Sequence, residues 1–427
     1  MIALDREKLA HYHNIFVAYS GGIDSHCLLH LISTHSSVKQ KTTAVYVHHG
    51  LSEHANDWQQ HCQNICQEYG IRFTACKITS TPAVGDSIEA WARVQRYEQF
   101  AQLLNSDDVL LTGHHADDQA ETLLLQLIRG AGVEGLAAMP RYRKLGKGCL
   151  YRPLLSYAKN SIQEYAAQHK LQWVDDESNA QEDFSRNYIR HSIMPNFLSR
   201  WPSVATTLNR SAQHCAESAQ LNEALAEIDY ESCSESCTQT MIIDKLLSLS
   251  IARQKNVLRY WINQTGFITP STKNLTRILT ELVPAAEDGE PLVEWQDVSV
   301  RRFQGKLYLS PKQLVMLEKE YVWDIGTDFS LVDKTLRLVP GGKLDKSRLP
   351  ETVSIRFRQG GEKIRPQGDT HTRTVKSLFQ TWQIAPWQRN STPLIYHNDE
   401  AALLSLISGS FKYPLYVGNT LMRHVLF

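Results

Sequence analysis

Apolar runs of strand length alternate with segments of helical periodicity over roughly the first 175 residues. The runs predict strands at 15–19, 44–47, 72–78, 109–112 and 172–174, and the segments between them predict helices near 25–34, 53–69, 87–104, 117–129 and 159–169. Alternation of this kind is typical of an α/β domain with a doubly wound, mainly parallel, Rossmann-like sheet. Ligands of such sheets bind beyond the carboxyl ends of the strands, so we expect residues 20–25, 48–50 and 113–118 to line one crevice.

The pattern changes after about residue 215. Helical periodicity predicts helices at 217–232, 244–263 and 271–283, and the Ser-rich stretch 231–238 is predicted to be a linker or exposed loop. Short apolar or alternating runs at 307–309, 331–339 and 353–357 predict strands. We therefore expect an α/β catalytic domain at 1–215, a mainly helical domain at 216–318 and a small α+β domain at 319–427.

Composition narrows the class of protein. The chain has 427 residues, enough for several buried cores, and a formal net charge of zero. It contains no run of about 18 apolar residues, and charged residues occupy positions 5–8, where a signal peptide would be apolar. Its eight cysteines include no C-x-x-C pair. We expect a cytoplasmic protein with no membrane partner, no disulfide framework and no cysteine metal site.

Two local runs of positive charge contrast with the neutral total. The first comprises Arg141, Arg143, Lys144, Lys147 and Arg152, and the second comprises Arg356, Arg358, Lys363, Arg365, Arg373 and Lys376. A charge run is usually a solvated face, but two such runs in a neutral protein also suit a polyanionic partner such as a nucleic acid. Both interpretations stay open at this point.

One segment gives the most specific prediction of function. In it, a predicted apolar strand is followed by Ser20, Gly21, Gly22, Ile23, Asp24 and Ser25, and then by a predicted helix. The two glycines allow a turn in which backbone N–H groups converge on an anion, and the serine hydroxyls add donors at the helix N-terminus. A carboxylate here would repel phosphate unless a divalent cation lay between them, so Asp24 is expected to hold Mg²⁺. The segment predicts a phosphate site for ATP and lacks the Gly-Lys-Ser/Thr of a Walker motif.

Residues 113–122 leave a predicted strand and open a helix on which Asp118 and Glu121 share a face. Acids in a first helical turn often serve only the helix dipole. Beside an ATP site they would also suit a cationic substrate or Mg²⁺, and a carboxylate or histidine could accept a proton from an amine nucleophile. On the helix near 87–104, Glu89, Arg93 and Arg96 form a charged stripe that is either a solvated ion-pair face or a grip on phosphate.

The loop at 20–25 resembles the SGGxDS motif of the N-type ATP pyrophosphatases, and the chain as a whole resembles the bacterial tRNA(Ile)-lysidine synthetases. That family carries EAxARxxRY, GHHADDQAET, Arg-Pro-Leu, an arginine-asparagine element and two C-terminal elements, which are matched at 89–97, 113–122, 152–154, 185–190, 361–366 and 376–380. The resemblance covers essentially the whole chain and is weakest in the central domain. Tyr46 and Ser52 stand where relatives often have His and Arg, which affects the adenine side of the site.

The resemblance implies a ligase that works in two steps. The carbonyl oxygen of the wobble cytosine in tRNA(Ile) with a CAU anticodon attacks the α-phosphate of ATP and releases pyrophosphate. The ε-amine of free L-lysine then displaces AMP and forms lysidine, which pairs with A instead of G. ATP and Mg²⁺ are the implied cofactors, and a homodimer is compatible with the family.

The resemblance also implies roles for individual residues. Asp24, Asp118 and Glu121 are the expected catalytic residues, with the lysine ammonium at Asp118 and Glu121. The expected tRNA contacts are Arg93 and Arg96 to phosphate or RNA, Arg186 and Arg190 to the anticodon region, and Lys363, Arg365 and Lys376 in the C-terminal domain.

Three other functions use parts of the same pattern. A tRNA 2-thiocytidine synthetase would activate the same kind of carbonyl with sulfur as nucleophile, but it needs paired cysteines for sulfur or an iron–sulfur cluster, and none occur near the predicted site. A glutamine-dependent synthetase would need an amide-hydrolysing Cys–His–Glu arrangement, which the sequence does not show. A tRNA-binding scaffold with a degenerate nucleotide loop is disfavoured by the complete motif at 20–25.

Overall fold

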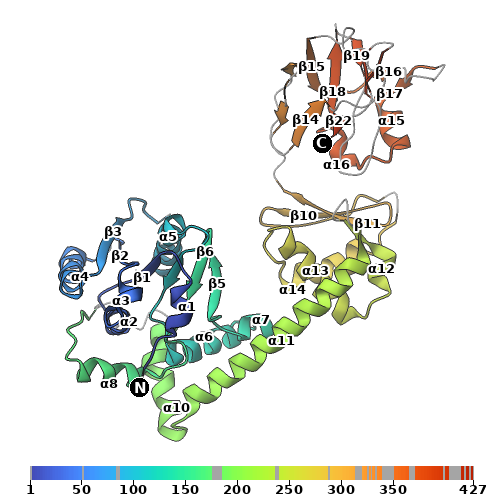
Figure 1. The fold of residues 1–427 in the computed structure, drawn as a ribbon. Coiled ribbons are helices and arrows are strands. Elements are labelled where there is room, and N and C mark those ends of the chain that lie inside the picture. The colour runs from blue at the N-terminus through green and yellow to red at the C-terminus, as the bar shows by residue number, and fades with distance from the viewer. Residues whose placement is uncertain are drawn as a thin grey trace. The chain divides into compact units, whose positions relative to one another are not determined.

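The computed structural model describes residues 2–50, 52–82, 87–175, 185–235, 240–286, 289–312, 320–324, 327, 329–331, 334–338, 351–364, 371–397, 400–402, 415–417, 420–422 and 425–426. The chain forms two compact units, Met1–Leu221 and Asn222–Phe427 (Figure 1). No helix within the described residues has the length and apolar character needed to cross a membrane.

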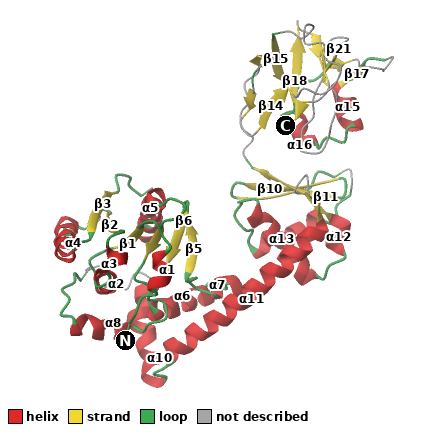
Figure 2. Ribbon diagram, viewed as in Figure 1, coloured by secondary structure: helices red, strands yellow, loops and turns green. Residues whose placement is uncertain are grey.

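A six-stranded sheet forms the centre of the first unit (Figure 2). Its strands are β1 (Ile15–Ala18), β2 (Thr42–His48), β3 (Arg72–Lys77), β4 (Val109–Leu111), β5 (Tyr142–Leu145) and β6 (Gly148–Tyr151). The order is β3-β2-β1-β4-β6-β5, and all neighbours are parallel except β5, which pairs antiparallel with β6. The predicted fold class, a doubly wound and mainly parallel sheet, is confirmed.

Helices cover both faces of this sheet (Figure 1). Successive side chains of a strand point to opposite faces, and accordingly Val17 and Phe16 of β1 belong to two different cores. The helices are α1 (Arg6–Ala10), α2 (Ile23–Ser33), α3 (Ser36–Lys39), α4 (Ala55–Tyr69), α5 (Ile88–Leu103), α6 (Ala116–Ile128), α7 (Val133–Leu136) and α8 (Lys159–Gln168). Helices α2, α4 and α8 pack on the core that contains Val17, whereas α5 packs on the core that contains Phe16.

Two local predictions in this unit are corrected by the structure. Residues 172–174 form no strand; the N–H of Val174 instead donates to the carbonyl oxygen of Gly21 at 3.0 Å, so the segment lies along the phosphate loop. The place beside β4 belongs to β6, in a hairpin that the sequence does not predict. The first three residues of β5 are exposed and mostly charged, so this edge strand lacks the apolar alternation of a half-buried strand.

The chain leaves the sheet through α9 (Ser185–Tyr188), the π-helical turn η2 (Ile189–Ile193), α10 (Met194–Arg200) and α11 (Val204–Cys233). Helix α11 begins before the predicted residue 217 and continues through the expected domain boundary at 215. Residues 231–233 belong to this helix and 234–235 to a strand, so the predicted linker is wrong for them; 236–239 lie outside the described residues. The division into three domains stays a prediction.

The second unit begins with helices packed on a five-stranded antiparallel sheet of order β7-β8-β11-β10-β9. Its strands are β7 (Ser234–Glu235), β8 (Thr240–Ile242), β9 (Leu292–Trp295), β10 (Val298–Phe303) and β11 (Lys306–Pro311). Its helices are α12 (Ile243–Leu247), α13 (Ile251–Gln264), α14 (Thr272–Arg277) and the π-helical turn η3 (Ile278–Leu282). Trp261 of α13 and Val300 of β10 are fully buried in their shared core. Of this sheet, the sequence predicts only the run at 307–309.

Where the structure describes it, the rest of the second unit combines short strands with two short helices, as predicted for an α+β fold. The strands are β12 (Glu320–Asp324), β13 (Phe329–Leu331), β14 (Lys334–Leu338), β15 (Thr352–Phe357), β16 (Lys363–Ile364), β17 (Arg373–Thr374), β18 (Pro393–His397), β19 (Glu400–Ala402), β20 (Leu415–Val417), β21 (Thr420–Met422) and β22 (Val425–Leu426). The helices are α15 (Val375–Thr381) and α16 (Pro386–Arg389). Phe379 and Leu394 are fully buried in the core of this part.

Candidate active site

The predicted phosphate loop joins β1 to α2 in a tight turn. Gly21 has a φ of +84°, a conformation that favours glycine, and a Cβ there would lie 3.1 Å from the Cys62 Sγ. Gly22 is the N-cap of α2. The Ser25 hydroxyl donates to the Gly22 carbonyl oxygen at 2.9 Å and lies 3.2 Å from the Ser20 hydroxyl. The strand, loop and helix of an anion site are therefore arranged as the sequence predicts.

A second loop, which follows β4, packs backbone to backbone against this one. A Cβ on Gly113 would lie 2.9 Å from the carbonyl carbon and oxygen of Asp24 and 3.0 Å from the N of Ser25. Backbone atoms cannot move aside as the end of a flexible side chain can. Glycine at 113 thus keeps the phosphate loop beside the first turn of α6.

Replacing Gly113 by alanine is expected to force these two loops apart. Overpacking of this kind destabilises a fold by about 1–3 kcal/mol, and here it also displaces Asp24. We expect a lower midpoint of urea unfolding and slower ATP cleavage. Gly132→Ala is the control, because a Cβ at Gly132 meets no atom within 4 Å. Equal stability and activity of the two variants would contradict the close approach.

Asp24 lies at the N-terminus of α2 between two basic side chains. The Lys159 Nζ is 2.6 Å from its Oδ1, and the His115 Nε2 is 3.7 Å from its Oδ2. Burial opposes ionisation, but His115 and Lys159 outweigh it and hold the pKa of the Asp24 carboxyl below its usual value. The backbone N–H of Lys159 also donates to Asp117 at 2.8 Å, which fixes the start of α8. No sequence pattern predicts the contact of Lys159 with Asp24.

The residues present could bind Mg²⁺ together with the phosphates of a nucleotide. Within the described part of the chain no group of three or more His, Cys, Asp or Glu side chains could hold a metal ion. Mg²⁺ commonly binds through one or two carboxylates together with phosphates and water, and Asp24 is an ionised carboxylate at a phosphate loop. Lys159 would have to leave the Asp24 oxygen that Mg²⁺ takes.

His115 connects the phosphate loop to the acids of α6. Its backbone N–H donates to the Asp118 Oδ2 at 3.0 Å, and its ring accepts from the Asp118 N–H at 3.4 Å, which makes a capping box. Its Nε2 lies 3.4 Å from the Asp118 Oδ2 and 3.7 Å from Asp24. Burial disfavours the imidazolium, but these two carboxylates outweigh it and raise the pKa of His115.

Asp118 and Glu121 do share one face of α6, and two arginines cover them. The Arg186 Nε lies 2.8 Å from Glu121 and its Nη2 lies 2.8 Å from Asp118; the corresponding Arg190 distances are 2.7 and 3.1 Å. The carboxylates are nearly buried, with side-chain exposures of 11% for Asp118 and 3% for Glu121. Burial raises the pKa of Asp118, but His115 and Arg186 lower it more, so it lies well below its usual value. The site is a charge-balanced cluster of two acids and two guanidinium groups.

The side chains of His48 and Tyr46, at the end of β2 and before the loop that follows it, form hydrogen bonds within the chain. His48 is buried, its Nε2 lies 3.1 Å from the Asn56 Oδ1, and its Nδ1 accepts from the Gly50 N–H at 3.1 Å. The Tyr46 hydroxyl donates to the Ala55 carbonyl oxygen at 3.1 Å. These contacts hold the loop against α4, which gives His48 and Tyr46 structural roles.

Known protein families and curated relatives match this chain over most of its length. Family models match at residues 4–197 (PP-loop domain), 243–308 (TilS substrate binding domain) and 353–407 (TilS substrate C-terminal domain). The tRNA(Ile)-lysidine synthase of Coxiella burnetii is 42% identical over 398 residues, which cover 91% of this chain and 87% of that protein. The enzyme of the same name from Serratia proteamaculans is 39% identical over 422 residues, covering 96% and 95%.

The chain belongs to the tRNA(Ile)-lysidine synthase family. The family that the sequence motifs suggested is thereby confirmed, and the match to a PP-loop domain supports the use of ATP at the loop after β1.

The tRNA contacts expected for a tRNA(Ile)-lysidine synthase lie on both units. On α5, the Arg93 guanidinium carbon is 5.3 Å from the centre of the Tyr97 ring, and Arg96 is partly buried. Lys363 of β16 and Lys376 of α15 are exposed, and Lys363 pairs with Thr374 across the two-stranded ribbon that precedes α15. Arg365 lies outside the described residues.

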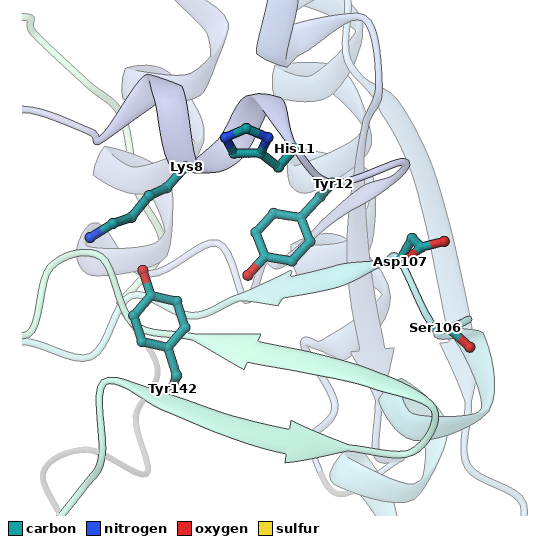
Figure 3. Close-up of a pocket in the computed structure, with 6 residues that line it drawn as sticks. All are labelled: Lys8, His11, Tyr12, Ser106, Asp107 and Tyr142. Atoms are coloured by element: carbon teal, nitrogen blue, oxygen red, sulfur yellow. The ribbon is translucent and has the colours of Figure 1, made fainter.

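A cavity of about 430 Å³ lies elsewhere on the first unit (Figure 3). It is lined by Lys8, His11, Tyr12, Ser106, Asp107 and Tyr142. Ser106 and Asp107 precede β4, whereas the phosphate loop follows β1, so the two lie toward opposite ends of the parallel strands. The predicted site residues of the tRNA(Ile)-lysidine synthase family do not line this cavity.

Proposed function

We propose that the protein ligates free L-lysine to the 2-position of the wobble cytidine in tRNA(Ile) with a CAU anticodon, through an adenylated cytidine, with release of pyrophosphate and AMP. One observation supports it most: the phosphate loop of β1 and the acid–arginine cluster of α6 stand at adjacent strand ends, joined by His115. The ATP site and the lysine site are then neighbours. Incorporation of labelled lysine into this tRNA is the experiment that tests the proposal.

In the adenylation step, the loop at 20–25 binds the phosphates of ATP with its backbone N–H groups and serine hydroxyls. Asp24 is assigned to Mg²⁺, which when bound would neutralise phosphate charge. Lys159 competes with the metal for the Asp24 carboxylate, and its ammonium is then available to a phosphate oxygen.

The acid–arginine cluster suits a free amino acid because it offers both signs of charge. A lysine zwitterion carries an α-ammonium and an α-carboxylate. We assign the ammonium to Asp118 and Glu121 and the carboxylate to Arg186 and Arg190. This revises the expected anticodon contact of the two arginines, because both guanidinium groups are engaged by the acids that the lysine needs.

Glu121→Gln is expected to raise the lysine KM by about tenfold or more, since a neutral amide holds an ammonium less well than a carboxylate does. Adenylation of the tRNA should remain detectable, because Glu121 does not contact the phosphate loop. Lysine titrations of product formation and a separate assay of pyrophosphate release measure the two effects.

Glu134→Gln is the matched control, since Glu134 is an exposed acid on α7. Its lysine KM should equal that of the unchanged chain. A lysine KM that stays constant in Glu121→Gln would remove Glu121 from the lysine site.

The rival thiolase function receives no support from the two thiols of α4, one of which lies against Gly21. Cys62 and Cys66 are buried on α4, and burial raises the pKa of each thiol to about 12. Thiols in this state do not present the thiolate that a sulfur carrier needs.

We propose that the other basic residues predicted to bind RNA contact the tRNA. Arg93 and Arg96 would contact phosphate or RNA near the site, and Lys363, Arg365 and Lys376 would bind the tRNA backbone from the second unit. We further propose a cytoplasmic protein, since its proposed substrates ATP and tRNA meet there. A homodimer stays a prediction.

A further inference from the structure

Two arginines from different elements lie at one tyrosine ring, and a third interacts with the same tyrosine. The guanidinium carbons of Arg93 on α5 and Arg143 on β5 lie 5.3 and 5.2 Å from the centre of the Tyr97 ring. Arg152 directly follows β6 and is only 2% exposed. Burial, followed by the nearby Arg143 and Arg93, lowers the pKa of Arg152, while Tyr97 acts in the opposite direction. Three positive charges therefore lie near one side chain.

Within the described part of the chain, these arginines have no carboxylate partner. Among the side chains that the structure describes, no carboxylate forms an ion pair with Arg93, Arg143 or Arg152. The Arg152 Nη1 donates to the Pro140 carbonyl oxygen, and its Nε has no hydrogen-bond partner. Buried charges are normally paired, because desolvation of an unpaired ion is strongly unfavourable. Arg93 and Arg143 are exposed, but Arg152 is thus a buried cation without a carboxylate partner among the described residues, and an anion from outside the chain would complete it.

The position of the group identifies the region that this anion occupies. The Thr112 N–H donates to the Tyr151 carbonyl oxygen at 3.2 Å, so the ends of β4 and β6 lie side by side. Two strand spacings separate β6 from β1, which places Arg152 on the order of 10 Å from the phosphate loop. Burial lowers the pKa of His114 to about 3, and Arg152, Arg186 and Arg93 contribute in the same direction. Arg152 and Arg93 thus lie near the β4 loop, beside the ATP site.

We propose that Arg93, Arg143 and Arg152 form a phosphate-binding site around Tyr97, and that a backbone phosphate of the RNA substrate occupies it. The inference rests on the proposed function and extends it to two residues with no role there, Arg143 and Arg152. Planar guanidinium groups bind phosphate oxygens in bidentate fashion. A phosphate held here fixes the position of the RNA chain while carrying no sequence information, which is how most backbone contacts act.

The same phosphate chemistry could come from ATP, and the distance from the loop favours RNA. A simpler explanation is that Arg143 only keeps positive charge on an edge strand, where charge prevents pairing with another sheet. In that case any cation at this position would serve equally well, and RNA affinity would not depend on the guanidinium group.

The test measures binding of a tRNA(Ile) transcript to the full chain by fluorescence anisotropy at several salt concentrations, without ATP or lysine. Arg143→Gln and Arg152→Lys are each expected to weaken binding about tenfold, the loss of one charge-assisted hydrogen bond. Arg143→Gln should also reduce the salt slope by about one. Arg152→Lys keeps a charge at the buried position, which guards against misfolding. Binding of a non-hydrolysable ATP analogue without tRNA should be unchanged in both.

Two control variants make the outcome decisive. Arg72→Gln with Lys77→Gln removes two exposed charges from β3, the opposite edge strand, and should leave tRNA binding unchanged. Lys144→Gln with Lys147→Gln removes two charges from the β5–β6 hairpin itself; a loss as large as that of Arg143→Gln would overturn the site in favour of a diffuse basic surface. Unchanged tRNA binding in Arg143→Gln and Arg152→Lys, or weakened binding of the ATP analogue alone, would also overturn it. Arginine-dependent tRNA binding without lysidine formation would instead refute the proposed function and leave the site standing.

Discussion

Asp24→Asn is expected to reduce pyrophosphate release by about a thousandfold, because metal stabilisation of phosphate charge is worth several kcal/mol and the amide is a poor Mg²⁺ ligand. The fold should persist, since Asp24 keeps part of its side chain in solvent, with 31% exposure. Pyrophosphate release in the presence of tRNA, measured over a range of Mg²⁺ concentrations, reports the effect. The residual activity should require a higher Mg²⁺ concentration than the activity of the unchanged chain does.

Asp57→Asn is the control for this variant, because Asp57 is an acid of α4 with 85% side-chain exposure. It should release pyrophosphate at the ordinary rate. Near-normal release by Asp24→Asn at low Mg²⁺ would remove Asp24 from the metal site and leave its ion pair with Lys159 as its role.

Replacing Arg186 and Arg190 together by glutamine is expected to lower the free energy of unfolding by about 3 kcal/mol at neutral pH, because Asp118 and Glu121 then lie buried without their cations. In the unchanged chain the pKa of Asp118 is held below its usual value. This carboxyl therefore stabilises the fold above about pH 4, and the contribution disappears as the pH falls through its folded pKa. In the double variant the arginines no longer counteract the effect of burial, so the pKa of Asp118 rises.

Urea unfolding between pH 4 and pH 7 tests this account. The difference between the two chains should be largest at pH 7 and should shrink toward pH 4, where protonation relieves the unpaired carboxyl in the variant. Arg277→Gln is the control, since its ion pair with Glu281 is exposed and should matter little. A difference that is constant with pH would show that lost packing, not charge, destabilises the double variant.

The sequence predicts the turn between β1 and α2 well because its cause is local. Two glycines, two serines and an acid follow a short apolar strand, and each residue acts within a few positions of its neighbours. The acid pair on α6 is predictable for the same reason, since Asp118 and Glu121 are three residues apart on one helix. The partners of these residues are not, because Arg186 reaches Glu121 across 65 positions and Lys159 reaches Asp24 across 135.

The errors of secondary structure also have a physical origin. The run at 172–174 is too short for its apolar content to distinguish a strand from a loop that packs on Gly21. Strand β5 escapes prediction because it carries exposed charges at the edge of the sheet. In the second unit, β7 and β8 have two and three residues, too few for any period to appear.

Labelled lysine supplied with ATP, Mg²⁺ and three tRNAs that share the CAU anticodon, tRNA(Ile) and the initiator and elongator tRNA(Met), tests the central claim most directly. The account predicts that lysine enters tRNA(Ile) and that AMP and pyrophosphate appear in equal amounts with the product. ATP cleavage without lysine incorporation, or incorporation of sulfur in its place, would contradict it.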